Sequence, residues 1–208
     1  MTVHAVHSEV GAPALRSTLV PRRGLLVDAL LVCAGTALVA ACAQISIPLG
    51  FTPVPLTGQT FAALLVGASL GMARGIASLL LYLLIGIAGL PVYADHNHGW
   101  HVFSGATGGY LVGFVLAAGL TGWLAERGLD RRFSSSISLM LTGTVVIYAW
   151  GLLWLHHVLH ANWATTLTDG LYPFVPGDLL KLYLAALALP TAWKLVNRAG
   201  GGAPRTDR

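Results

Sequence analysis

Six apolar stretches dominate this chain and limit what it can fold into. They cover about residues 25–47, 57–73, 75–91, 105–125, 136–159 and 174–197. A helix needs roughly 17–25 apolar residues to cross a bilayer. Only 10% of the residues are charged, whereas soluble domains carry about 25%. The sequence therefore predicts an all-α integral membrane protein with six transmembrane helices.

We expect one membrane domain over residues 25–197, with polar tails at 1–24 and 198–208. The second and third apolar stretches are short and are joined by Ala73-Arg74-Gly75, which predicts a tight hairpin. The run that ends at Cys42 superficially resembles a bacterial lipoprotein signal. Signal peptides begin with a short basic segment, whereas here the leading segment is long and the apolar run continues past Cys42. We therefore expect the first helix to be retained.

The basic residues predict how the helices are oriented. Eleven of the twelve lie in the N-terminal tail, the turn after the second stretch, the loop after the fourth, or the C-terminal region: Arg16, Arg22, Arg23, Arg74, Arg127, Arg131, Arg132, Lys194, Arg198, Arg205 and Arg208. The loops 48–56, 92–104 and 160–173 contain no Lys or Arg. Because cytoplasmic loops carry the excess of Lys and Arg, we expect both termini in the cytoplasm and a pocket open to the outer side.

The sequence lacks the motifs that are typical of several classes of protein function. A phosphate-binding GxxxxGK[ST] loop is absent, so the chain does not hydrolyse ATP by that route. The net charge of +4 comes from loop residues and indicates topology, not nucleic-acid binding. No obvious nucleophile or metal triad suggests an intramembrane enzyme. We expect no enzyme activity, no bound cofactor, no resident metal and no nucleic-acid partner.

Small residues recur at helical spacing in three places. Such stripes let helix backbones approach closely in lipid. Around the hairpin and on the fourth stretch, at Gly67, Gly71, Gly75, Gly109 and Gly113, they predict packing within the bundle. On the first helix the same pattern fits internal packing or docking to another membrane protein, and its members are Ala29, Cys33, Ala37 and Ala41.

The first outer loop, Ile47 to Thr57, contains three prolines and no charge. Proline fixes φ and removes a backbone donor, so this segment is stiff and non-helical. Non-helical backbone at membrane depth persists where it packs on protein or lines a cavity. The loop therefore either caps an outward-facing pocket or is a plain connector.

Histidines concentrate on the predicted outer side. His96, His98 and His101 follow Asp95 closely, and His156, His157 and His160 add a second group. These residues suggest an alternative function, a divalent metal-ion permease component. Against it, no His-Glu-x-x-His or Cys/His spacing typical of metal sites is present.

Asp178 and Lys181 are charged residues inside the last apolar stretch. Their (i, i+3) spacing places both on one helix face. A charge at a helix centre in the bilayer costs roughly 2.5–3.5 kcal/mol on insertion scales, so both should face a bundle interior or cavity. The pair either joins two helices or forms a ligand site, in which Lys181 attracts a carboxylate and Asp178 accepts hydrogen bonds from N–H donors.

Four ordered motifs in this sequence resemble those of a known family. They are Phe51-Thr-Pro-Val-Pro-Leu-Thr57-Gly-Gln59-Thr60, Gly89-Leu-Pro-Val-Tyr93, Thr107-Gly-Gly-Tyr110-Leu-Val-Gly and Val175-Pro-Gly-Asp178-Leu-Leu-Lys181. Over roughly residues 25–195 the chain resembles BioY, the biotin-specific substrate-binding (S) component of energy-coupling factor (ECF) transporters.

The resemblance implies a protein of the bacterial inner membrane that captures biotin from outside for uptake. It implies a transmembrane T component and paired ATPase subunits as partners, which use ATP, and it makes the first-helix stripe the docking surface. Some family members are reported without a dedicated energising module, so the resemblance leaves action alone or as an oligomer open.

The resemblance also implies roles for site residues. Asp178 would accept from the ureido N–H groups of biotin, and Lys181 would pair with its carboxylate. Further polar contacts would come from Thr57, Gln59, Asn97 and Tyr110, and Tyr93 or Trp100 would cover the rings. The segment Asp95 to Gly99 departs from the glycine-rich family pattern. An arginine helps to hold the ligand in some members; the outer half of this chain has none, which leaves Lys181, with His98 or His101, for the carboxylate.

Overall fold

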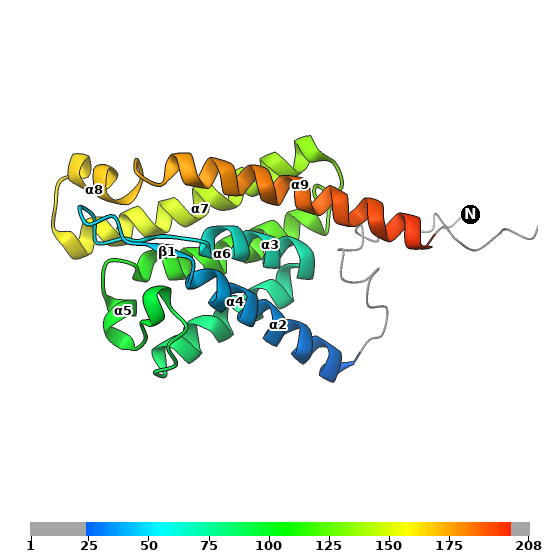
Figure 1. The fold of residues 1–208 in the computed structure, drawn as a ribbon, viewed down its shortest axis with the longest axis horizontal. Helices are drawn as coiled ribbons and strands as arrows, with labels where there is room; N and C mark the ends of the chain where they lie inside the picture. Colours follow the sequence, from blue (N-terminus) through cyan, green and yellow to red (C-terminus); the bar gives the residue numbers. More distant parts are fainter. Residues whose placement is uncertain (1–23, 201–208) are drawn as a thin grey trace, which may run out of the picture.

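The computed structural model describes residues 24–200, with side chains described as far as Leu195. The predicted tails therefore lie outside the described residues, apart from Gly24 and residues 198–200. A helix occupies each of the six apolar stretches: α2 (Leu25–Ala43), α3 (Gln59–Leu70), α4 (Met72–Ile87), α6 (Gly108–Ala125), α7 (Phe133–Leu159) and α9 (Val175–Gly200). They lie roughly along one common direction (Figure 1).

The helices differ in their ability to cross a membrane. Within the described part of the chain, α2, α6 and α7 are each long and apolar enough to do so. A fourth candidate span is the pair α8 (Trp163–Gly170) and α9, which is bent by 49° at the break between them. α3 and α4 are shorter, with 12 and 16 residues. The chain has the composition and helix lengths of a multi-pass membrane protein.

The loops carry short elements that the sequence analysis did not predict. Strands β1 (Ser46–Ile47) and β2 (Leu56–Thr57) pair antiparallel on either side of the proline-rich loop, with Ser46 opposite Thr57. The next loop contains a 3-10 helix, η1 (Ala94–His96), and a short helix, α5 (Trp100–Ser104). The segments 92–104 and 160–173 are partly helical, and tertiary contacts order them; Thr52 Oγ1, for example, donates to the Asp169 carbonyl at 2.6 Å.

The turn between α3 and α4 also differs from the prediction. It is made by Gly71, whose φ of 84° lies in the left-handed region that glycine tolerates. Arg74 and Gly75 belong to the first turns of α4, not to the connection. The hairpin is therefore tighter than the sequence suggested.

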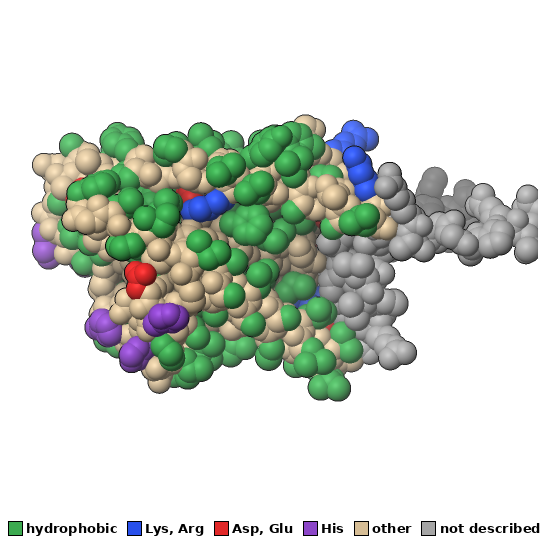
Figure 2. All heavy atoms as spheres, in the orientation of Figure 1, with side chains coloured by type: hydrophobic (Ala, Val, Ile, Leu, Met, Phe, Trp, Pro, Cys, Tyr) green, Lys and Arg blue, Asp and Glu red, His purple; other side chains and the backbone are tan. Residues whose placement is uncertain are grey.

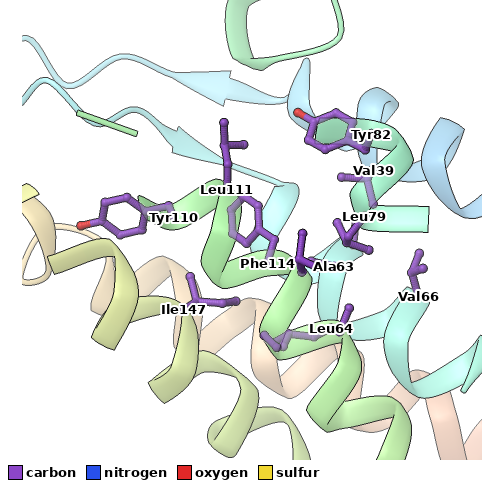
Figure 3. Packing of buried hydrophobic residues seen from close by; sticks show 14 of the residues in the cluster. Val39, Ala63, Leu64, Val66, Leu79, Tyr82, Tyr110, Leu111, Phe114 and Ile147 are labelled. Atoms are coloured by element: carbon purple, nitrogen blue, oxygen red, sulfur yellow. The ribbon is translucent and has the colours of Figure 1, made fainter. Parts of the chain in front are cut away.

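α6 forms the centre of the bundle and packs against α3, α4 and α7. Its close approach to α7 depends on Gly109, where an added Cβ would lie 2.6 Å from the Trp150 carbonyl oxygen. At Gly67 an added Cβ would lie 2.4 Å from the Ala118 carbonyl oxygen, so α3 also touches α6 at backbone distance. The prediction that these glycines serve internal packing is confirmed. Figure 3 shows Phe114 and Leu111 of α6 in this core with Ile147 of α7.

α2 begins and α9 ends at the same end of the molecule (Figure 1). Basic side chains gather at that end, and histidines lie at the opposite end (Figure 2). Two contacts fasten the basic end: Arg74 Nε pairs with Asp28 Oδ1 at 2.8 Å, and the buried Asp130 accepts a 2.5 Å hydrogen bond from Trp193 Nε1. Asp28, in the first turn of α2, thus ties α2 to α4.

Candidate functional site

A cavity of about 390 Å³ lies at the end of the bundle that carries the outer-loop elements. This volume falls within the range of about 300–1,000 Å³ typical of small-molecule sites. The proline-rich loop lines it through Pro48, Thr52 and the segment 53–57. The prediction that this loop caps a pocket is confirmed. Other walls come from η1, α5 and the first turns of α6 and α9.

The cavity brings together seven of the residues that the resemblance implied as ligand contacts. All seven line it: Thr57, Gln59, Tyr93, Asn97, Tyr110, Asp178 and Lys181. They come from four separate stretches of the chain, at 57–59, 93–97, 110 and 178–181, so the fold and not local sequence brings them together. Of the residues considered less firmly, His101 lines the cavity, whereas Trp100 and His98 are not among its lining residues. Ligand contact by any of them stays a prediction.

Asp178 and Lys181 form an ion pair on the wall of this cavity. Lys181 Nζ lies 2.9 Å from Asp178 Oδ1, and Asp178 is buried. The pair sits early in α9 because the helix begins at Val175 and Pro176 is tolerated in a first turn. A buried charge is stable only when it is paired and hydrogen-bonded. Both conditions are met here.

The ammonium of Lys181 has no donor to spare. Besides Asp178, Nζ donates to the Thr57 carbonyl oxygen at 2.6 Å and to Thr60 Oγ1 at 3.3 Å. An ammonium has three N–H donors, so these three acceptors use all of them. A direct contact between Lys181 and a ligand anion would require one of these bonds to be given up.

The carboxylate of Asp178 is held from both sides. Thr60 Oγ1 donates to Oδ1 at 3.2 Å, and the Tyr148 hydroxyl on α7 donates to Oδ2. Each oxygen of an ionised carboxylate can accept about two hydrogen bonds, so Oδ2 can accept another from a ligand. The sequence analysis missed Thr60 and Tyr148 as site residues. A hydroxyl in an apolar run gives no sign of the face on which it lies, although Thr60 stands within a quoted motif.

Two predicted tyrosines use their hydroxyls to hold the backbone. Tyr110 donates to the Gly170 carbonyl at 2.8 Å, which fixes the end of α8, and Tyr93 donates to the Leu83 carbonyl at 2.6 Å. Burial raises the pKa of Tyr93, in the outer segment, to about 12, so the phenol stays protonated at neutral pH. Both residues therefore offer the cavity aromatic ring surface, while their O–H groups are already committed.

Glutamines brace the segment that follows α4. Gln59 Nε2 donates to the Tyr82 hydroxyl at 2.6 Å, and that hydroxyl donates to the Val92 carbonyl at 3.1 Å. Gln44, at the end of α2, donates to the Tyr93 carbonyl at 3.1 Å and accepts from the His96 amide at 3.1 Å. These bonds fix the wall that contains Tyr93 and Asn97. Gln44 was missed because no pattern marks a residue that bonds only to main chain.

The outer histidines form pairs rather than a metal site. The rings of His98 and His101 lie 6.5 Å apart, and those of His157 and His160 lie 6.0 Å apart. His156 stacks on Trp163 at 4.1 Å. Within residues 24–200, no three His, Cys, Asp or Glu side chains are grouped so that they could hold a metal ion. The alternative of a metal permease gains no support.

The small-residue stripe of α2 faces outward. All four of its members, Ala29, Cys33, Ala37 and Ala41, are exposed. Only 17% of the apolar window of α2 is buried, against 67% for α6. The bundle leaves this stripe uncovered. Its use as a docking surface stays a prediction.

Comparison with known proteins agrees with this geometry. The profile described as the BioY family matches residues 15–198, which is most of the chain. The chain belongs to the BioY family. Its relatives include the biotin transporter BioY of Thermotoga maritima, 42% identical over 73% of this chain and 87% of that protein. The biotin transporter BioY of Rhizobium etli is 37% identical over 68% of this chain and 79% of that protein.

A solved structure supports the same BioY assignment at the level of the fold. It is the crystal structure of the S-component for biotin from an ECF-type ABC transporter. The two structures superpose with a TM-score of 0.74 at 26% sequence identity, over 81% of this chain and 92% of the other. The arrangement of helices around the cavity is thus that of an S-component.

Proposed function

We propose that this chain is the substrate-binding component of an ECF-type importer and captures biotin for uptake into the cell. The observation that carries this function is the buried Asp178–Lys181 pair, which lies on the wall of a 390 Å³ cavity in a BioY-family chain. No chemical step is assigned to the chain. ATP is consumed by partner subunits; this proposal is consistent with a sequence that has no phosphate-binding GxxxxGK[ST] loop.

The chemistry of biotin matches the cavity. Biotin has an apolar bicyclic body, a ureido group with two N–H donors and one carbonyl, and a carboxylate at the end of an alkyl chain. Asp178 receives a ureido N–H on Oδ2, and Tyr93 and Tyr110 offer ring surface to the apolar body. Thr57, Gln59 and Asn97 complete the polar wall.

Lys181 holds the carboxylate of Asp178 in place. Its ammonium lies 2.9 Å from Asp178 Oδ1, so this pair leaves Oδ2 able to accept a hydrogen bond from a ligand. The pairing of Lys181 with the biotin carboxylate, which the sequence resemblance implied, would compete with its three present acceptors. The relative affinities for biotin and biotinamide separate these two roles.

The chain sits in the bacterial inner membrane with six spans, both termini in the cytoplasm and the cavity on the outer side. The supporting observation is the asymmetry of charge along the bundle. Lys and Arg gather where α2 begins and α9 ends (Figure 2), and the cavity lies among loops that contain none. Cytoplasmic loops carry such an excess of cations.

The partners are a transmembrane T component and paired ATPase subunits. The exposed stripe on α2 suits this interaction because small residues let a second helix approach closely in lipid. Beside the stripe, α2 and α3 form an apolar groove lined by Leu31, Ala34, Gly35, Leu38, Leu65, Val66, Ser69 and Leu70. The stripe and the groove both lie on the lateral surface of the helix bundle, and the groove shares no lining residue with the cavity.

Uptake of labelled biotin tests this function. The host is a strain that neither makes nor imports biotin, and the chain is expressed with and without T-component and ATPase subunits of a related importer. We expect accumulation with the partners, lost in Asp178→Asn and kept in Asp169→Asn, which makes the same chemical change on α8. Uptake by the chain alone would show solo transport. Equal accumulation with Asp178→Asn and the wild type would contradict the proposal.

A further inference from the structure

The charges around the cavity leave the ligand carboxylate without a free cation at the α9 wall. Among the described residues that line the cavity, Lys181 and His101 are the two that can carry a positive charge. The charge of Lys181 is offset by Asp178, and its three donors are engaged. The imidazole of His101 is the remaining group that can become cationic.

His101 belongs to a different wall from Asp178. It lies on α5, which packs against α4 and α6, whereas Asp178 lies on α9. Figure 1 shows α5 and α9 on opposite sides of the β1–β2 hairpin. The ureido group and the carboxylate lie at opposite ends of biotin. A molecule whose ureido group meets Asp178 therefore extends its carboxylate away from α9.

On this basis, and resting on the proposed function, we infer that His101 receives the biotin carboxylate and makes capture depend on pH. A protonated imidazole donates a charge-assisted hydrogen bond to a carboxylate, which is about twice as strong as a neutral one. An unperturbed imidazole loses its charge between about pH 5 and 8. The ligand carboxylate stays ionised over that range. Capture is therefore tighter on the acid side.

Other ionisable groups lie near His101 or line the same cavity. The His98 ring lies 6.5 Å away and is outside the cavity lining, whereas Asp95 on η1 shares the same wall. From the other elements the ionisable groups at the cavity are Tyr93, Tyr110, Tyr148 and the Asp178–Lys181 pair. The tyrosines do not titrate between about pH 5 and 8.

Binding of two ligands by the purified full-length chain tests the assignment. The ligands are biotin and biotinamide, which differ in the charge of the terminal group, and each is titrated at about pH 5.5 and about pH 8. The variants are His101→Gln, His101→Arg and, as the matched control, His98→Gln. The quantity compared is the ratio of the Kd for biotinamide to the Kd for biotin.

In the wild type and in His98→Gln, we expect biotin to be preferred about tenfold at the lower pH and much less at the higher. His101→Gln should bind both ligands about equally at either pH. His101→Arg should prefer biotin at both pH values, because a guanidinium stays charged; this gain also distinguishes a lost contact from a damaged fold.

Two results would overturn the assignment. If His101→Gln still prefers biotin to biotinamide, and the preference does not vary with pH, then Lys181 and not His101 binds the biotin carboxylate. If the preference for biotin is lost in His98→Gln but kept in His101→Gln, then His98 binds the biotin carboxylate. If the wild type bound neither ligand, the proposed function would fail as well, so the two failures are distinguishable.

Discussion

At the scale of single residues, the candidate site depends on one ion pair and the hydroxyls around it. Asp178 accepts from Lys181, Thr60 and Tyr148, which come from three different helices. Removing one partner of a buried pair leaves an uncompensated charge, which costs about 3–5 kcal/mol. The least disruptive test is therefore to remove a neutral partner and keep the pair.

Tyr148→Phe is such a change. It removes the hydrogen bond to Asp178 Oδ2 and leaves the ring in place. We expect the affinity for biotin to fall about tenfold, because Asp178 loses a donor that holds Oδ2 in position for the ligand. Calorimetric titration measures this change. Tyr172→Phe, at an exposed outer position, is the control; an unchanged affinity in Tyr148→Phe would remove Tyr148 from the site.

A second residue-scale prediction concerns Asp130 in the loop between α6 and α7. Burial raises the pKa of this carboxyl, although Trp193 and Arg131 lower it in part. The folded chain therefore holds the proton more tightly than the unfolded chain, so the contribution of Asp130 to stability falls as pH rises from the unfolded pKa through the folded one. Asp130→Asn stays neutral and keeps an oxygen for Trp193 Nε1.

We expect Asp130→Asn to raise the Tm by a few degrees at about pH 7. Below about pH 4 we expect no effect, because neither the wild-type carboxyl group nor the amide of the variant is then charged. Thermal unfolding in detergent, with Asp169→Asn as the matched control, measures the difference. A Tm that falls at neutral pH would mean that the ionised carboxylate stabilises the fold.

Asp178 and Lys181 could be predicted from the sequence because they are charged residues in an apolar run. The other five residues came from the resemblance to BioY, and all seven line the cavity. Their exact contacts could not be found in the same way. Thr60 and Tyr148 lie in helices where only the packing decides which face meets the cavity. Likewise, the sequence could not show that the Lys181 ammonium donates hydrogen bonds to Thr57, Thr60 and Asp178. Thr57, for example, is 124 positions away in the chain.

At the scale of elements, the helices followed the apolar runs closely and the loop structure did not. The six helices were predictable because a backbone in lipid must bond internally. The hairpin of β1 and β2, α5 and α8 were not. Gly58 N, for instance, donates to the Ile45 carbonyl at 2.9 Å across the proline-rich loop, a contact set by the return of the chain rather than by its local pattern.

α2 carries the prediction that belongs to this scale. Ala37→Trp places a large side chain on the exposed stripe, which prevents close approach of a partner helix. We expect biotin uptake with the partner subunits to fall at least about tenfold, while biotin binding by the isolated chain is unchanged. The matched control is Ala188→Trp, at an exposed position on α9. If both variants transported like the wild type, the stripe would not be the docking surface.

At the scale of the whole molecule, the proposed orientation in the membrane rests on the charge asymmetry and the position of the cavity. The side with the cavity should face outward. In a background with Cys33 and Cys42 replaced by Ser, a membrane-impermeant maleimide should label Asn162→Cys in intact cells and label Arg127→Cys only after lysis. Labelling of Arg127→Cys in intact cells would reverse the orientation.

The central claim is that biotin binds in the cavity against Asp178, and calorimetric titration of the purified chain tests it most directly. The wild type and Asp169→Asn should each bind one biotin per chain. Asp178→Asn should bind at least about a hundredfold more weakly, because it loses the charged acceptor, while it remains folded by thermal unfolding. No binding by the wild type, or equal binding by Asp178→Asn, would contradict the account.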